Sequence, residues 1–310
     1  MESITLKIDL ETLTKMETFY QEIINREQKN DYILWSCKTI DDVNITIYTS
    51  KKGLKAFFTG EKCLNEAKIW NPEATYNQKK EKIEYSWLYL DDQIGSDEVG
   101  TGDFFGPIIV VASYIKKEDI PYLRELKVND SKKLTDEKIL EIVPKLLDKV
   151  VFSKLTCTNT KYNQLVSQGY SMNKIKALLH NHAINKVKER INNQDVECFI
   201  DQFCDVDLYY NYLQYEEKVN TKNITFHTKG ESYYPSIAVS SMIARYCFLK
   251  ELDLISDKYQ IEIIKGASVK TDRCAKEFYQ KYGLEELKKV VKINFKNYQE
   301  LIKSDKEYKD

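Results

Sequence analysis

The chain has 310 residues, of which 42% are hydrophobic and 31% charged, and its formal net charge is −1 at pH 7. This composition is typical of globular proteins and excludes disordered and fibrous classes. The seven cysteines are odd in number and contain no CxxC pair, which argues against a disulfide framework and a zinc site. The N-terminus lacks a signal-peptide pattern, and no apolar run approaches ~18 residues. We therefore expect one or two domains in a reduced, cytoplasmic protein that has no membrane span.

The basic residues are almost all lysines: 47 lysines and arginines include only five arginines. Lysine carries a mobile point charge suited to phosphates, whereas the arginine fork suits the reading of individual bases. A solvated surface accounts for most of these lysines. Residues 51–82 contain eight lysines and only four glutamates. A solvated surface and a surface that binds phosphates explain this local excess of positive charge equally well.

The first 70 residues form a self-contained pattern. A strand-like segment is followed by a segment with helical spacing, then by three strand-like segments and a short helix. In chain order these segments are residues 3–10, 11–28, 32–40, 43–50, 54–60 and 61–70. Gly53 lies in the turn between the last two strands, where it is free to take positive φ. The pattern predicts a small α+β domain, and the polar, aperiodic residues 71–86 are predicted to be a linker.

From residue 87 onward, strand and helix patterns alternate. Strands are predicted at 89–98, 106–115, 150–158 and 196–203, and helices at 134–150, 172–191 and 235–252. Pro235 suits the first turn of the last of these helices. Strands mixed with helices in this way predict an α/β domain, residues 87–310, whose sheet is covered by helices on both faces.

Three glycines, Gly100, Gly102 and Gly106, superficially match a dinucleotide-binding motif. The spacing is GxGxxxG rather than GxGxxG, and the segment that follows is strand-like, not the helix that would hold a pyrophosphate. The chain also lacks the GK[ST] of a P-loop. These glycines instead predict a tight turn whose backbone approaches something bulky.

Four acidic residues lie where predicted strands end or a helix begins. Asp97 and Glu98 follow an apolar strand, Asp201 ends another, and Glu231 precedes a helix rich in small residues. Burial of carboxylates costs free energy unless something compensates. A lone acid of this kind is usually a helix cap or half of an ion pair, but four together indicate convergence on divalent cations. Oxygen ligands without accompanying histidine or cysteine point to magnesium or manganese.

The pair Asp97 and Glu98 makes a further structural demand. Adjacent residues of a regular strand face opposite sides of a sheet. For both carboxylates to reach one metal site, the chain must leave β geometry near Glu98, and Gly100 and Gly102 would permit that departure.

Several segments are similar to the signature of ribonuclease HIII, a type 2 ribonuclease H. They are "GSDEVGTGDFFGP", "NDSKKL", "MNKIKALLHNHAI", the aspartate of "FIDQF" and "KGESYYPSIAVSSMIAR". The likeness covers residues 88–298, and the preceding α+β domain resembles the TATA-binding-protein-like domain of that family. Glu231 in "KGES" and the Gly-Thr-Gly turn match ribonuclease HIII rather than its ribonuclease HII relatives, whereas "FIDQF" and "KINFKNYQE" depart from the expected pattern.

The resemblance implies a ribonuclease H-like mixed sheet flanked by helices, and endonucleolytic cleavage of the RNA strand of RNA–DNA hybrids. Two Mg²⁺ or Mn²⁺ ions would act in the reaction, and the products would carry 5′-phosphate and 3′-hydroxyl ends. The implied catalytic and metal-binding residues are Asp97, Glu98, Asp201 and Glu231.

The resemblance also implies how the substrate is held. Gly100, Thr101 and Gly102 would bring backbone groups against the 2′-hydroxyl, which distinguishes RNA from DNA. The implied phosphate contacts are Ser131, Lys132, Lys133 and Lys229. The N-terminal domain would add affinity without reading sequence, through Lys51, Lys52 and Lys55. We expect a monomer with no obligate protein partner.

Two alternatives remain open at this point. The chain could be a non-catalytic hybrid-binding module whose acids are structural, although a degenerate site usually lacks a ligand. It could also be another metal-dependent nuclease of the same fold. Cleavage of DNA, or cleavage of a hybrid in chelator, would indicate a function other than that of a ribonuclease H.

Overall fold

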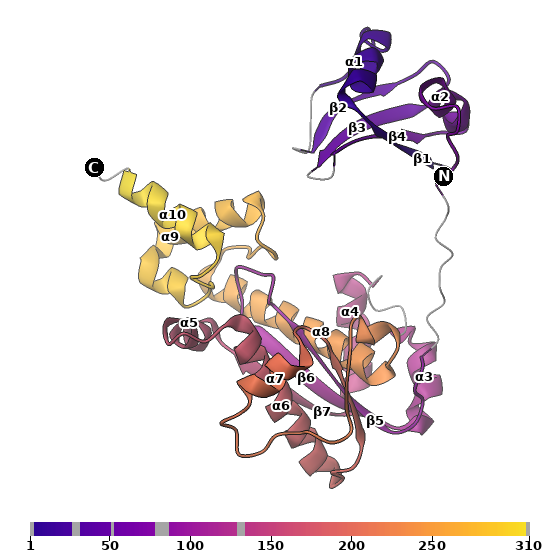
Figure 1. Ribbon diagram of the computed structural model, residues 1–310. Helices are drawn as coiled ribbons and strands as arrows, with labels where there is room; N and C mark the ends of the chain where they lie inside the picture. The colour runs from indigo at the N-terminus through magenta and orange to yellow at the C-terminus, as the bar shows by residue number, and fades with distance from the viewer. Residues whose placement is uncertain (1–2, 27–31, 51–52, 78–86, 129–133, 308–310) are drawn as a thin grey trace. The chain divides into compact units, whose positions relative to one another are not determined.

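The computed structural model describes residues 3–26, 32–50, 53–77, 87–128 and 134–307 (Figure 1). The chain divides into two compact units, residues 1–84 and residues 85–310. Each unit has its own hydrophobic core, and each is described separately.

The N-terminal unit is a four-stranded antiparallel sheet with two helices. Its elements are β1 (Ser3–Ile8), α1 (Leu10–Phe19), β2 (Ile33–Lys38), β3 (Asn44–Ser50), β4 (Gly53–Thr59) and α2 (Cys63–Trp70). The strands lie in the order β1-β4-β3-β2. This is the succession of strand, helix, three strands and helix that the sequence predicts.

One face of this sheet is buried and the other is open. Alternate strand residues such as Ile4, Ile45 and Phe58 are buried together with Met16 of α1 and Ala67 of α2. Because register partners share a face of an antiparallel sheet, the residues between them in sequence lie on the opposite face. The helices therefore cover one face of the sheet, and no helix among the described residues of this unit packs on the other.

The N-terminal unit extends past residue 70, where the sequence analysis places its end. The backbone N–H of Asn77 donates to the carbonyl of Ser3, and its side-chain amide donates to the hydroxyls of Ser3 and Thr5. Ala74 is buried in the same core. Residues 71–77 thus pack on β1, and the remainder of the predicted linker, residues 78–86, lies outside the described residues.

The second unit contains a mixed sheet and most of the helices. Its strands are β5 (Gln93–Val99), β6 (Ile108–Ile115), β7 (Val151–Cys157), β8 (Glu197–Asp201) and β9 (Ile224–His227). Its α-helices are α3 (Ile120–Glu125), α4 (Asp136–Leu147), α5 (Asn159–Ser167), α6 (Met172–Ile191), α7 (Val206–Tyr212), α8 (Pro235–Tyr259), α9 (Val269–Lys288) and α10 (Lys296–Glu307). Short 3-10 turns lie at Lys117–Asp119 and Gly230–Ser232.

The five strands lie in the order β7-β6-β5-β8-β9. β5 pairs antiparallel with β6 and parallel with β8, so it occupies the centre of the sheet. A core containing residues of α4, α8 and α9 covers one face, and a core containing residues of α6 and α7 covers the other. Figure 1 shows α8 and α6 on opposite sides of the strands. The predicted ribonuclease H-like mixed sheet with helices on both faces is confirmed.

Helix α8 packs unusually close to β5. A Cβ atom on Gly95 would lie 2.2 Å from the backbone nitrogen of Ile237, so only glycine permits this approach. The contact is also partly polar, since the Ser240 hydroxyl donates to the Gly95 carbonyl at 2.9 Å and lies 2.8 Å from the Ser113 hydroxyl. Because these buried groups have defined hydrogen-bonding partners, they fix the rotation of α8 against the sheet.

One prediction about β5 is wrong. The strand does not leave β geometry near Glu98, because its ladder with β6 continues through the pairs Glu98–Val110 and Val99–Ile109. The backbone departs only at Gly100, where φ is 88°. Asp97 and Glu98 therefore point to opposite faces of the sheet.

Two findings bear on the expected environment of the protein. Among the described residues, no helix combines the length and apolar character required to cross a bilayer. All seven cysteines are free, and five of them are buried.

Candidate active site

Two of the predicted catalytic acids lie side by side on neighbouring parallel strands. Ser96 of β5 pairs with Ile200 of β8, so the next residues, Asp97 and Asp201, occupy adjacent positions on one face. Asp201 is the last residue of β8, and Asp97 lies two residues before the end of β5. Neighbouring strands are about 4.8 Å apart. Two carboxylates at such positions repel each other strongly unless a proton or a cation intervenes.

The third acid, Glu231, enters the same region through a short 3-10 turn. The backbone N–H of Gly230 donates to Oδ1 of Asp201 at 2.7 Å, which ties this turn to the end of β8. A Cβ atom on Gly230 would lie 2.4 Å from Cδ1 of Ile237 in α8. The turn is therefore packed between β8 and α8, and it holds Glu231 in a buried position.

The fourth acid, Glu98, faces α6 instead. Its Oε1 accepts a hydrogen bond from Nζ of Lys176 at 2.9 Å, and its Oε2 lies 2.9 Å from Nε2 of His180. Nδ1 of His180 lies 2.7 Å from the Ser96 hydroxyl. Since all four side chains are buried or nearly buried, they form an enclosed polar cluster beside the carboxylate pair.

Opposite electrostatic environments act on the two adjacent acids. Burial, followed by the negative charges of Glu98 and Asp201, raises the pKa of Asp97 well above its ordinary value, against hydrogen bonds from Ser241 and the Glu98 backbone. Burial alone would also raise the pKa of Glu98, but its hydrogen bonds and ionic contacts with His180 and Lys176 outweigh burial and lower it. Glu98 is thus held ionised, and Asp97 is the acid that a bound cation would relieve.

The donor chemistry of this region fits a hard divalent cation. Asp97, Asp201 and Glu231 offer carboxylate oxygens, the donors that Mg²⁺ and Mn²⁺ prefer. Burial and the negative charges of Glu98 and Asp201 raise the pKa of Asp97, so a cation would relieve both effects. In the part of the chain that the structure describes, no group of three or more His, Cys, Asp or Glu side chains is arranged to hold a metal ion. The chemistry of the site fits a cation, although its side chains are not closed around one.

Sequence reasoning missed two residues of this region. Lys176 and His180 contact Glu98 from one face of α6, and their spacing of four residues is the signal for a shared helix face. The sequence alone did not show that this face meets Glu98. The pairing connects residues 78 and 82 positions apart.

The glycine turn, residues 100–102, follows β5. The fold requires one of its two glycines and does not require the other. At Gly100, φ is positive and an added Cβ would lie 2.1 Å from the carbonyl oxygen of Pro107. At Gly102, φ lies outside that positive range and an added Cβ would meet no described atom within 4 Å. Gly102 is exposed and Thr101 half-buried, so the outer side of the turn is open to a ligand.

The predicted phosphate contacts are only partly described. Lys229 is exposed, takes a left-handed conformation with φ of 59°, and directly precedes the turn that carries Glu231. Ser131, Lys132, Lys133, Lys51 and Lys52 lie outside the described residues. Lys55 belongs to β4 and pairs with Lys7 of β1 and Tyr48 of β3, which places all three on the open face of the N-terminal sheet.

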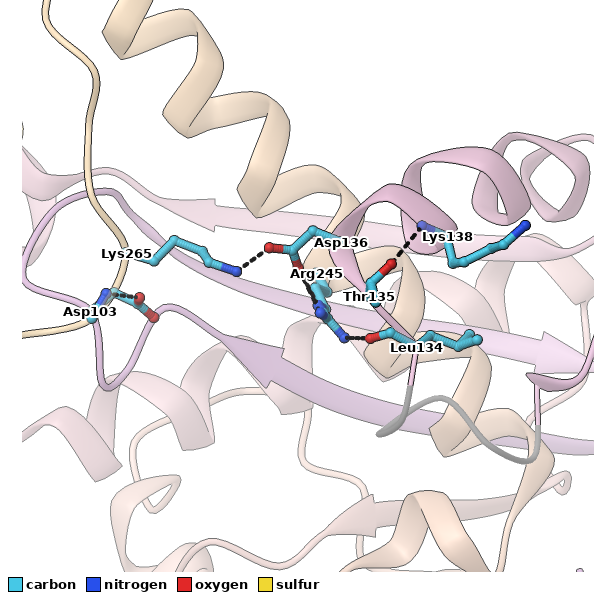
Figure 2. A network of polar contacts seen from close by, with 8 residues as sticks. Asp103, Leu134, Thr135, Asp136, Lys138, Arg245 and Lys265 are labelled. Atoms are coloured by element: carbon cyan, nitrogen blue, oxygen red, sulfur yellow. Dashed lines mark hydrogen bonds and ion pairs between the residues drawn. The ribbon is translucent and has the colours of Figure 1, made fainter.

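An ionic network fixes the chain immediately after residue 133. In Figure 2, Asp136 at the start of α4 lies between Arg245 of α8 and Lys265. Arg245 donates to Oδ1 of Asp136 at 2.9 and 2.6 Å and to the carbonyl of Leu134 at 3.0 Å. Through this network, α8 anchors Leu134 and the start of α4.

Comparisons with known proteins match both units of the chain. The model of the family described as Ribonuclease HII matches residues 94–298, and the model described as Domain of unknown function (DUF3378) matches residues 3–83. A ribonuclease HIII from Phytoplasma mali is 40% identical, with 96% of this chain and 97% of the relative covered. A ribonuclease HIII from Listeria monocytogenes is 38% identical, with 98% and 99% covered. This chain belongs to the ribonuclease HIII family.

Solved structures support the same assignment. A crystal structure of Bst-RNase HIII in complex with Mn²⁺ is 31% identical, has a TM-score of 0.69 and covers 98% of this chain and 99% of its own. The ribonuclease H2 from Pyrococcus horikoshii covers 69% of this chain at 23% identity with a TM-score of 0.59, which shows a shared fold. The chain is thus an endoribonuclease of the ribonuclease HIII family, and the likeness to a Mn²⁺ complex supports a divalent metal.

The charge balance at Asp97 generates a stability prediction. In chelator at pH 8, Asp97→Asn should raise the free energy of unfolding by about 1–2 kcal/mol, because it removes a buried negative charge beside Glu98 and Asp201. The folded-state pKa of Asp97 is raised above its ordinary 3.8, so between these two values the folded state binds more protons. Wild-type stability should therefore recover as pH falls through the raised pKa, and the difference from the variant should shrink.

Denaturant unfolding between pH 4 and pH 8 measures this difference. Adding Mg²⁺ or Mn²⁺ at pH 8 should stabilise wild type more than Asp97→Asn, since the ion favours the folded state in proportion to its affinity. A variant that is less stable than wild type in chelator at pH 8 would contradict the proposed repulsion.

Proposed function

We propose that this member of the ribonuclease HIII family hydrolyses the RNA strand of RNA–DNA hybrids endonucleolytically. The products would have 5′-phosphate and 3′-hydroxyl ends. The observation that carries the proposal is the adjacency of Asp97 and Asp201 on parallel strands, with Glu231 tied to the end of β8. The glycine turn directly after β5, in which Gly102 is exposed, lies next to these acids in sequence.

The acids divide the work of the site between them. Asp97, Asp201 and Glu231 would hold Mg²⁺ or Mn²⁺ at the carboxyl ends of β5 and β8. Glu98 is kept ionised by Lys176 and His180. It is the fourth acidic residue of the proposed site and adds negative charge beside the other three. When bound, two divalent ions neutralise charge at the scissile phosphate and lower the pKa of the attacking water.

Recognition of RNA is assigned to the glycine turn. An open approach at Gly102 allows main-chain groups of Gly100, Thr101 and Gly102 to reach a 2′-hydroxyl, the group that distinguishes RNA from DNA. Lys229, and the segment Ser131–Lys133 that precedes the Asp136 network, would contact phosphates.

The N-terminal unit would supply general affinity through the open face of its sheet. Lys7 and Lys55 are register partners on this face, and Tyr48 and Phe57 lie on it with their ring centroids 6.5 Å apart. Lysines combined with aromatic rings suit a nucleic-acid backbone without reading base sequence. Lys51 and Lys52, which lie outside the described residues, are proposed to add to this affinity.

The cellular compartment and the oligomeric state are part of the proposal. Seven free cysteines suit a reducing compartment, and we place the enzyme in the cytoplasm, as a monomer that acts without an obligate protein partner. Elution at the mass of one chain, 36.5 kDa, is the expected result in size-exclusion chromatography with light scattering.

Substrate choice tests the main proposal. The enzyme should cut the RNA strand of an RNA–DNA hybrid in Mg²⁺ or Mn²⁺ and leave a DNA duplex and an RNA duplex of the same sequence intact. Chelator should abolish cutting, and Asp201→Asn should abolish it while binding is retained. Gel analysis of end-labelled strands identifies the ends that are produced.

Two results would reject the proposal. Cutting of the DNA duplex, or cutting of the hybrid in chelator, would indicate a different nuclease. Specific hybrid binding without cutting in either metal would favour the non-catalytic hybrid-binding module.

The two glycines of the turn provide a second prediction. Gly102→Ala should leave the thermal unfolding midpoint unchanged, because its Cβ enters open space, and should lower hybrid cleavage at least about tenfold by obstructing the ribose. Gly100→Ala should lower the midpoint, because its positive φ and the Pro107 carbonyl both oppose a side chain. Cleavage by Gly102→Ala at the wild-type rate would remove the turn from substrate recognition.

A third prediction concerns the N-terminal sheet. The double variant Lys7→Glu and Lys55→Glu should raise KM for the hybrid about tenfold or more with kcat nearly unchanged, and should flatten the salt dependence of binding. Lys68→Glu changes an exposed lysine of α2, on the helical side of the unit, and serves as the control. Equal KM values for the double variant and the control would place the substrate elsewhere.

A further inference from the structure

A buried lysine near the C-terminus contacts the glycine turn from inside the protein. Lys292 has no solvent exposure, and its Nζ donates to the carbonyl oxygens of Asp103 at 2.8 Å and Gly106 at 2.6 Å. Burial lowers the pKa of Lys292 to about 7, despite the opposing influence of Asp103 and Cys157. Lysine is almost never fully buried unless paired, so this position indicates a specific demand for a donor.

The carbonyl groups that require this hydrogen-bond donor belong to residues 103–106, the segment that continues the glycine turn. Its main chain bonds with the C-terminal segment: Gly106 N–H donates to Val290 at 2.9 Å, and Lys292 N–H donates to Phe104 at 3.0 Å. The side-chain amide of Asn159, at the start of α5, adds a second donor to the Gly106 carbonyl at 2.9 Å. The segment is thus held by two separate elements that lie far from it in sequence.

A third attachment joins the same segment to the start of α4. Gly266 N–H donates to Oδ1 of Asp103 at 2.6 Å, and Gly266 accepts from Phe104 N–H at 2.9 Å. The preceding residue, Lys265, contacts Asp136 (Figure 2). The glycine turn and the start of α4 are therefore linked through one framework.

This framework reaches the turn through Pro107. Gly100 lies so close to the Pro107 carbonyl that no Cβ fits between them. Lys292 fixes the carbonyls of Asp103 and Gly106, and these residues determine where Pro107 and Gly100 meet. A shift of about 1 Å in a group that orients a substrate can lower a rate about 100-fold.

We propose that Lys292 is a positioning residue for ribose recognition, which holds the glycine turn so that its backbone meets the 2′-hydroxyl. This inference rests on the proposed function, which assigns that hydroxyl to Gly100, Thr101 and Gly102. Lys292 does not touch the substrate itself. Its effect is specific to substrates that carry the hydroxyl, whereas general loss of structure lowers the rate for every substrate.

The test compares two hybrids under single-turnover conditions with enzyme in excess. One contains an RNA strand, and the other contains a 2′-fluoro strand of the same sequence, which cannot donate a hydrogen bond from the 2′ position. The measured quantity is the ratio of the two cleavage rates. Lys292→Met keeps the aliphatic stem and removes the donor, and it should lower this ratio at least about tenfold.

Two other variants complete the design. Asn159→Ala removes a different donor to the Gly106 carbonyl and should lower the ratio in the same direction. Lys188→Met is the matched control, since Lys188 is also buried and donates to a backbone carbonyl, that of Gln194 at 3.0 Å, on α6. This control should leave the ratio at the wild-type value. In steady state, Lys292→Met should lower kcat with KM within about twofold, because phosphate contacts still bind the hybrid.

The outcomes separate this inference from the proposed function. A wild-type ratio near one would refute ribose recognition by the turn, and with it the proposed function. A large wild-type ratio that Lys292→Met leaves unchanged, or that Lys188→Met lowers equally, would overturn the role of Lys292 alone. If Lys292→Met does not fold, the test uses the ratio of cleavage rates measured for Asn159→Ala. An unchanged ratio in that variant overturns the inference.

Discussion

The unbroken ladder of β5 with β6, together with the parallel pairing of β5 with β8 up to Ser96, is the constraint on which the site depends. The ladder with β6 continues to Val99, and the parallel pairing with β8 aligns Ser96 with Ile200. Because the ladder with β6 continues through Asp97 and Glu98, successive side chains must alternate between the two faces of the sheet. Asp97 is therefore placed beside Asp201, and Glu98 is directed to the other face of the sheet.

This alternation gives two neighbouring carboxylates opposite electrostatic environments. Glu98 meets Lys176 and His180, which compensate its burial. Burial, together with the negative charges of Glu98 and Asp201, raises the pKa of Asp97. Charge repulsion of this kind destabilises the metal-free protein and favours a cation, a familiar conflict between stability and function at catalytic sites. The positive charge on α6 also limits the net charge that bound ions must neutralise.

The glycine turn shows how rigidity and access are combined. Its inner side is fixed by contacts at Gly100 and by buried donors such as Lys292, while its outer side at Gly102 is open. Backbone groups can recognise a substrate hydroxyl only if they are held in place before the substrate arrives. Burial of the Lys292 side chain costs desolvation free energy, and the two carbonyls that it holds behind the turn meet that requirement.

The sequence by itself determined the elements of the N-terminal unit, strands β5 to β8 and helices α4, α6 and α8, because strand alternation, helical spacing and glycine chemistry are local properties. It also singled out the four acids and the turn, but it did not predict β9 or the helices α3, α5, α7, α9 and α10. It could not determine which face Glu98 adopts, since that depends on how far β5 stays paired with β6. Nor could it show that Lys176, His180 and Lys292 surround the site, because each contacts a residue at least 78 positions away. Only tertiary packing brings such residues together, since buried charges and carbonyls find their partners wherever the folded chain places them.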